Sequence, residues 1–191
     1  PKFPYHELFD PDDIYIVSNN ELDNKLDMLS KRLKIPDENR MPYDEDMLEI
    51  LYEQFEEQFT EAVDDKEKPT HKLIIFDDCG YSGDLKNKAS GIVSKIVCNG
   101  RHACISSIFN IQKYTQASTV LRTNMSAAIF GGVSSKELDL IAEDINMFPN
   151  KKDFIELFRS HTKGNRDFFC VNFTGEDGIY YNKYFEPINK K

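Results

Sequence analysis

Apolar runs alternate with stretches of helical periodicity along most of the chain. The runs predict strands over residues 13–18, 71–78, 103–111 and 126–131. Between and after them, apolar residues recur at helical spacing and predict helices over residues 21–34, 44–63, 89–98, 134–146 and 152–161. Leu73 to Phe76 form an unbroken apolar run, which is typical of a parallel strand covered on both faces. The alternation therefore predicts an α/β fold with a mostly parallel sheet flanked by helices.

Polar residues mark where helices begin. The pair Asn19 and Asn20 stands ahead of the first helical stretch and predicts its start. Ser134 with Glu137 forms a capping box ahead of a later helix. Residues 36–70 form an acidic helical insertion, whose charged side we interpret as a solvated face.

The C-terminal end of the chain has a different pattern. Residues 167–173 and 179–185 are two aromatic-rich segments, and Gly175 and Gly178 lie between them. This arrangement predicts an antiparallel hairpin. We therefore expect one domain over residues 1–191, with a C-terminal antiparallel hairpin at the edge of its sheet.

Composition narrows the classes of function. With 191 residues the chain is long enough for one domain with a sizeable core. A net charge of −9 argues against a small basic nucleic-acid-binding module, although a DNA-handling machine can confine its Lys and Arg to a channel. The four cysteines form no CxxC pair, so we expect reduced thiols, as in a cytosolic or nuclear setting. No apolar run approaches the roughly 20 residues that span a membrane, so we expect no membrane partner.

The first chemical signal is a pair of acids at the end of the apolar strand. The sequence LIIFDD delivers Asp77 and then Asp78 to the carboxyl end, where open α/β sheets place their ligands. Asp77 is a candidate to hold Mg²⁺, which prefers one or two carboxylates together with substrate phosphates. Asp78 is a candidate to orient or deprotonate water. The alternative is an exposed strand-end pair that caps the following loop.

An amide and two arginines follow the acids in order. Gln112 comes just after the strand over 103–111, where its amide can hydrogen-bond a γ-phosphate or the attacking water. Arg101 precedes that strand and Arg122 precedes the next one. An arginine offered to a neighbouring subunit's nucleotide stabilises transition-state charge. A surface ion pair or a helix-end contact is the alternative for each arginine.

These residues carry a resemblance. The segments HKLIIFDDCG and NGRHACISSIFNIQKYTQASTVLRTNMSAAIFGG resemble the poxvirus-type genome-packaging ATPases of large DNA viruses, members of the FtsK–HerA superfamily of P-loop ATPases. The resemblance covers about residues 72–144. It implies that Asp77 and Asp78 are the Walker B pair, that Gln112 is the polar sensor, and that Arg101 or Arg122 is the arginine finger.

The sequence departs from this family in one respect, because the phosphate-binding motif GxxxxGK[ST] occurs nowhere in it. In the family this loop and its strand precede the segment that DIYIVS resembles, and the strand is central in the sheet. We therefore expect the ATPase core to be incomplete at its N-terminus. The complete protein is expected to be an ATPase, and the chain alone is expected not to bind Mg·ATP tightly.

The resemblance also implies partners and a location. It implies ATP and Mg²⁺ as cofactors, double-stranded DNA as the cargo, a homo-oligomeric ring of five or six subunits, and a capsid or portal component as a further partner. The expected location is the host cytoplasm or a viral factory, with the virion as a further possibility. Lys86, Lys88, Lys95 and Lys113 are candidate DNA contacts only because a channel needs cations.

Two other functions remain open from the residues. Asp77, Asp78 and Asp84 together suggest the metal cluster of a nuclease or phosphatase, although no later His, Asp or Glu group completes it. A non-catalytic scaffold or adaptor that keeps the ATPase fold agrees with the missing phosphate loop.

Overall fold

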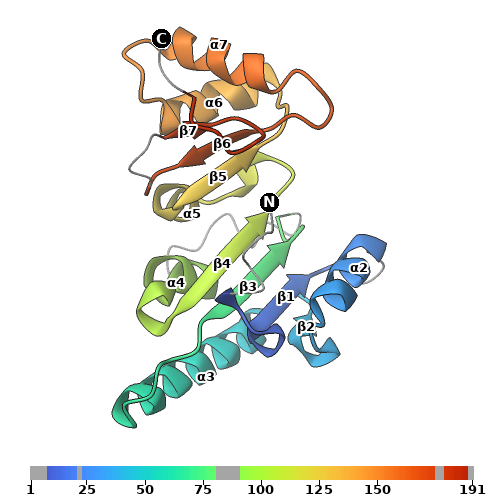
Figure 1. The fold of residues 1–191 in the computed structure, drawn as a ribbon, viewed down its shortest axis with the longest axis vertical. Coiled ribbons are helices and arrows are strands. Elements are labelled where there is room, and N and C mark those ends of the chain that lie inside the picture. Colours follow the sequence, from blue (N-terminus) through green and yellow to red (C-terminus); the bar gives the residue numbers. More distant parts are fainter. Residues whose placement is uncertain (1–7, 21–22, 81–90, 175–178, 189–191) are drawn as a thin grey trace. The chain divides into compact units, whose positions relative to one another are not determined.

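A computed structural model describes residues 8–20, 23–80, 91–174 and 179–188. The chain divides into two compact units (Figure 1). The N-terminal unit comprises Pro1–Gln112 and Gln116–Leu121, and the C-terminal unit comprises Lys113–Thr115 and Arg122–Lys191. The expectation of a single domain stays a prediction.

A parallel sheet forms the centre of the N-terminal unit. Its strands are β1 (Ile14–Ser18), β2 (Arg40–Met41), β3 (Lys72–Asp77) and β4 (Ile105–Asn110). Their order is β2-β1-β3-β4, and every neighbouring pair is parallel. The three longer strands lie where the apolar runs predict them. The two-residue strand β2 was not predicted, because two residues are too few to show a pattern.

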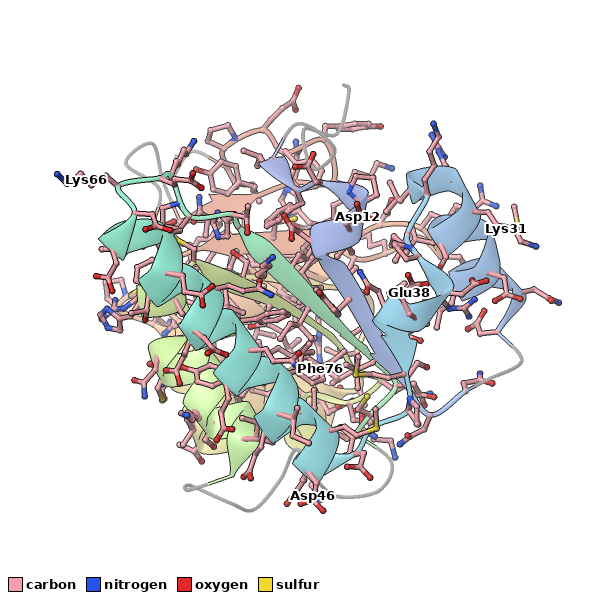
Figure 2. The ribbon with its side chains drawn as sticks, turned by 90° about the horizontal axis from the view of Figure 1, so that it is seen from below. Asp12, Lys31, Glu38, Asp46, Lys66 and Phe76 are labelled. Atoms are coloured by element: carbon pink, nitrogen blue, oxygen red, sulfur yellow. The ribbon has the colours of Figure 1, made fainter. Side chains whose placement is uncertain are left out.

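Different helices cover the two faces of this sheet, and each face buries a different set of strand residues. The helices α3 (Glu45–Asp64) and α4 (Ile92–Asn99) pack on one face, where Val17, Ile74 and Phe76 are buried. Figure 2 shows α3 crossing the strands from Asp46 towards Lys66. Helix α2 (Asn24–Leu33) packs on the other face through a cluster made of Phe9, Ile14, Ile16, Leu26, Ile35 and Leu73. Alternate residues of β1 and β3 therefore point to opposite helical layers, as a doubly covered sheet requires.

The prediction that Asn19 and Asn20 start the first helix is wrong. The carboxylate of Asp23 caps α2 instead, accepting hydrogen bonds from the Lys25 and Leu26 backbone N–H groups at 2.7 and 3.4 Å. The Asn19 side chain is used elsewhere, because its Oδ1 accepts from the Tyr43 N–H. Whether a polar side chain caps a helix therefore depends on the other hydrogen-bond partners within its reach as well as on its residue type.

The C-terminal unit contains an antiparallel sheet in the order β5-β6-β7. Its strands are β5 (Ala127–Phe130), β6 (Phe169–Asn172) and β7 (Tyr180–Tyr181), and its helices include α6 (Ser135–Ile145) and α7 (Lys151–His161). The predicted hairpin forms as the pair β6–β7, but it belongs to this separate antiparallel sheet and not, as was expected, to the edge of the parallel sheet. The run over 126–131 does form a strand, but β5 pairs antiparallel with β6 rather than extending the parallel sheet. The capping box of α6 is confirmed, since the Glu137 N–H donates to Ser134 Oγ.

Aromatic side chains dominate the core of the C-terminal unit. Phe154, Phe158 and Phe169 are at most 1% exposed, and their rings lie 5.3–6.1 Å apart. Tyr180 packs on Phe154 and Phe169 and donates its hydroxyl to the Ile145 carbonyl. Such ring pairs add to the burial of apolar area.

The short helix α5 (Thr119–Asn124) precedes β5 and was not predicted. The cysteine thiols are free, as the sequence predicts. Within the described ranges, every helix is either too short or too polar to cross a bilayer.

Candidate functional site

The two aspartates lie at the carboxyl end of β3 in different backbone conformations. Asp77 is the last residue of the strand and is only 8% exposed. Asp78 follows in the left-handed region with φ 51°, so the chain turns as soon as the strand ends. Aspartate adopts this conformation more readily than most residues. One acid is therefore buried at the end of the strand, and the other is half-buried on the turn.

Asn110, the last residue of β4, contacts both acids. It faces Asp77 in the parallel register, and its Nδ2 donates to Asp77 Oδ1 at 2.6 Å. Its main-chain carbonyl accepts from the Asp78 N–H at 3.1 Å. Asn110 was not among the residues predicted from the sequence. The available signal was its place two residues before Gln112, at the end of a strand predicted to pair with β3.

Gln112 lies beside Asp78, as its position at the end of the next strand suggests. Its Nε2 donates to Asp78 Oδ1 at 2.9 Å. Gln116, which was likewise not predicted, accepts from the Gln112 N–H through Oε1 at 3.1 Å. The same Gln116 side chain packs so closely on Gly80 that an added Cβ would lie 2.9 Å from it. Gln116 therefore joins the turn after β3 to the loop after β4.

The donors at this sheet edge fit Mg²⁺. Asp77 Oδ2 accepts no hydrogen bond from the described residues, so one oxygen of this buried carboxylate is available to a cation or its water shell. No group of three or more His, Cys, Asp or Glu side chains that could hold a metal occurs in the described part of the chain. Two carboxylates without further protein ligands suit Mg²⁺ that also binds substrate phosphates. Asp84, the third acid of the nuclease hypothesis, lies outside the described residues.

The two candidate arginines have different surroundings. Arg101 lies on the 3₁₀ turn Gly100–Ala103, ahead of β4, and is exposed. The length of β4 separates it from Asn110, so the structure does not bring Arg101 to the acids of its own unit.

Arg122 belongs to a polar cluster in the C-terminal unit, in which its buried Nε has no hydrogen-bond partner among the described residues. Its Nη1 lies 2.5 Å from Asp144 Oδ2, which also accepts from the Tyr114 hydroxyl at 2.8 Å. The guanidinium lies 5.2 Å from the Tyr114 ring centroid. Burial raises the pKa of Tyr114, and the hydrogen bond to Asp144 raises it further. This geometry supports the ion-pair alternative for Arg122.

The candidate DNA-contacting lysines stay predictions. Lys86 and Lys88 lie outside the described residues. Lys95 pairs with Glu56 at 3.3 Å and lies over the Tyr52 ring, and Lys113 belongs to the C-terminal unit.

A cavity of about 310 Å³ lies beside the end of β1. Its lining includes Ser18, Asn20, Asp37 and Arg40, but not the two aspartates. The Arg40 guanidinium is already paired with Asp27 at 2.7 Å, so this cavity offers no free cation from that side chain.

The family model for the poxvirus A32 protein matches residues 33–183, which include both aspartates, Asn110, Gln112 and both arginines. The chain belongs to the poxvirus A32 protein family. The resemblance drawn from its motifs is thereby confirmed. No curated protein sequence matches this A32-family chain.

Solved structures share the fold of the A32-family chain. The genome packaging NTPase B204 of Sulfolobus turreted icosahedral virus 2, in complex with sulfate, matches with a TM-score of 0.59 and 16% identity, covering 98% of this chain and 86% of that one. The DNA-packaging ATPase B204 of Sulfolobus turreted icosahedral virus matches with a TM-score of 0.60 and 16% identity, covering 97% and 85%. The virus 2 protein in complex with AMPPCP matches with a TM-score of 0.59 and 15% identity, covering 98% and 87%. The predicted α/β fold class is confirmed by these matches and by the parallel sheet.

Proposed function

We propose that this chain is the Walker B half of a genome-packaging motor ATPase, which couples ATP hydrolysis to the translocation of double-stranded DNA into a viral capsid. The observation that carries the proposal is the set of polar contacts at the ends of β3 and β4. Asp77, Asp78 and Gln112 meet at the carboxyl edge of parallel strands. Ligands of open α/β sheets bind at such an edge. Family membership and the B204 fold support the same function.

Each residue then has a stated role. Asp77 would hold Mg²⁺ through its water shell, and the metal would supply positive charge that balances the phosphates. Asp78 orients the attacking water or accepts its proton. Gln112, held against Asp78 at 2.9 Å, senses the γ-phosphate by exchanging this hydrogen bond for one to the nucleotide. B204 has been solved with AMPPCP and with ATP-γS, which supports a nucleotide as the ligand here.

The open edge of the sheet supports the proposal that the core lacks its phosphate-loop strand. β4 pairs with β3 on one side, and none of the described strands pairs with its other side. Ile108 of β4 is 40% exposed although it lies in the middle of a parallel strand. Parallel strands are normally covered on both faces, so an additional strand and helix would bury this residue. We propose that the phosphate-loop strand and the helix after it take this place.

The arginine finger of the proposed ring is Arg101 rather than Arg122. Arg101 is exposed and distant from the acids of its own unit, as a residue that acts on a neighbouring subunit must be. Arg122 is already paired with Asp144. A homo-oligomeric ring of five or six subunits, a capsid or portal partner, and an infected-cell cytoplasm or viral factory location complete the proposal.

A scaffold that keeps the ATPase fold without turnover is the second candidate, because the phosphate-binding motif is absent from these residues. One experiment separates the two. The protein including any residues encoded upstream of Pro1 is assayed for ATP hydrolysis with and without double-stranded DNA. DNA-stimulated hydrolysis supports the motor, whereas no hydrolysis and no GxxxxGK[ST] upstream supports the scaffold.

The chain itself provides an independent check. Without a phosphate loop it is expected not to bind Mg·ATP tightly, since most contacts to the phosphates would be missing. Micromolar affinity in titration calorimetry would contradict this part of the proposal.

A further inference from the structure

Asn110 touches both acids, and it does so through two different groups. Its side-chain amide donates to Asp77 Oδ1, and its main-chain carbonyl accepts from the Asp78 N–H. Both contacts follow from the parallel register, in which Asp77 lies opposite Asn110. The contacts are therefore set by the sheet, which is more rigid than a loop.

We infer that Asn110 is a positioning residue that fixes both carboxylates for the divalent cation and for water, an inference that rests on the proposed function of the two acids. The bond to Asp77 Oδ1 stops the carboxylate from rotating and leaves Oδ2 for the cation's water shell. The bond to the Asp78 N–H holds the left-handed turn that brings the Asp78 carboxylate to Gln112.

Asn110 contributes less to folding than to this geometry. The residue is exposed, so water can replace the amide bond when the side chain is removed. The main-chain bond to Asp78 persists in any side-chain variant other than proline. Asn110→Ala is therefore expected to keep a urea unfolding midpoint close to that of the wild type, while Asp77 becomes free to rotate.

Mn²⁺ without nucleotide is a direct probe of the proposed cation site at Asp77, because Mn²⁺ is paramagnetic and replaces Mg²⁺ on oxygen ligands. It is titrated into the ¹⁵N-labelled chain while the broadening of the Asp77, Asp78 and Cys79 amide signals is measured. Asn110→Ala is expected to need about tenfold more Mn²⁺ for the same broadening, as for other residues that orient a metal ligand.

A matched control is Asn99→Ala, an exposed asparagine on α4 that is remote from the acids in sequence and makes no side-chain hydrogen bond among those found in the described chain. It is expected to behave as the wild type. Wild-type broadening in Asn110→Ala would overturn the inference.

The Mg²⁺ dependence of ATP turnover is a second measurement, independent of the Mn²⁺ titration. In the ATP-hydrolysing protein, Asn110→Ala is expected to raise the Mg²⁺ concentration for half-maximal turnover about tenfold, with a smaller change in kcat at saturating Mg²⁺. A fall in kcat with an unchanged Mg²⁺ requirement would contradict the inference. If the wild type hydrolyses no ATP, the proposed function fails, and the Mn²⁺ comparison still decides the role of Asn110.

Discussion

The two units of the chain each contain a cluster of polar side chains, and the clusters differ in whether a described cationic side chain pairs with their acids. In the C-terminal unit, Asp144 accepts from both Tyr114 and Arg122, and the arginine also lies over the tyrosine ring. In the N-terminal unit, Asp77 and Asp78 accept from the side-chain amides of Asn110 and Gln112, and none of the described Lys, Arg or His side chains forms an ion pair with either acid. A carboxylate paired with a cation of its own fold has its charge balanced, whereas acids without such a cation are available to a cationic ligand.

The two units also differ in net charge. The N-terminal unit has 23 Asp and Glu against 13 Lys and Arg, and the C-terminal unit has 10 against 11. The overall charge of −9 therefore comes from the unit with the acid pair. A Mg²⁺ site next to phosphates depends on cations to offset such negative charge.

The largest expected effect on stability lies in the aromatic core of the C-terminal unit. Phe158 is 1% exposed and contacts three other rings. Phe158→Ala should lower the free energy of unfolding by about 3–5 kcal/mol, measured by urea denaturation. Tyr184→Ala, at a residue that is 68% exposed, is the control and should change it by less than about 0.5 kcal/mol. Equal losses in both variants would show that the ring cluster is not the core.

An alkaline transition tests the core of the N-terminal unit. Burial, aided by Glu56, raises the pKa of Tyr52 to about 12 from its usual value near 10. The buried neutral tyrosine therefore stabilises the fold below pH 10, and this contribution is lost as the pH rises towards 12. The free energy of unfolding of the wild type should fall by about 2 kcal/mol relative to Tyr52→Phe between pH 9 and 12. Parallel pH curves for the two proteins would contradict the assignment.

Replacing one acid in each cluster compares the clusters directly. Asp144→Asn removes the charge that Arg122 faces in a half-buried setting and should cost about 1–2 kcal/mol. Asp77→Asn keeps an oxygen that can accept from Asn110 and should cost less than about 1 kcal/mol. The urea unfolding midpoints of the two variants measure which substitution costs more stability. A larger loss for Asp77→Asn would make the N-terminal cluster the structural one.

The smallest expected effect concerns the acidic face of α3. Glu49, Glu53, Glu57 and Glu61 are exposed and spaced four residues apart, so neighbours repel. Glu53→Gln should therefore raise the free energy of unfolding by about 0.2–0.5 kcal/mol at low salt. The gain should disappear in 1 M NaCl, and a loss of stability at low salt would indicate that Glu53 has a favourable partner.

Sequence patterns predicted the elements well where a pattern is long. The run from Leu73 to Phe76 and the helical spacing of apolar residues in α3 are strong signals. A strand buried on both faces explains the first pattern, a helix buried along one stripe explains the second, and few other structures fit either. The partner of β5 could not be predicted in this way. Its apolar run has the same composition in a parallel or antiparallel pair, and the choice is made by residues Phe169–Asn172, far along the chain.

Only part of the candidate site could be predicted, because some of its contacts depend on how distant segments pair. Asp77, Asp78 and Gln112 were found because acids and amides at the ends of apolar strands stand out. Asn110 and Gln116 did not stand out, since a polar residue near a loop is common and only the parallel register shows that Asn110 faces Asp77. Arg122 was a candidate from its place in the motif, whereas its partners Tyr114 and Asp144 became visible only in the fold.

We propose that the cluster at Asp77 and Asp78 serves ATP hydrolysis, and Asp78→Asn tests this role most directly. The substitution keeps the size of the side chain and an oxygen that can accept from Gln112, so the urea midpoint should stay within about 1 kcal/mol of the wild type. In the ATP-hydrolysing protein, kcat for Mg·ATP should fall by at least about 100-fold, because the water loses its acceptor. ATP hydrolysis at the wild-type rate in Asp78→Asn would contradict the account.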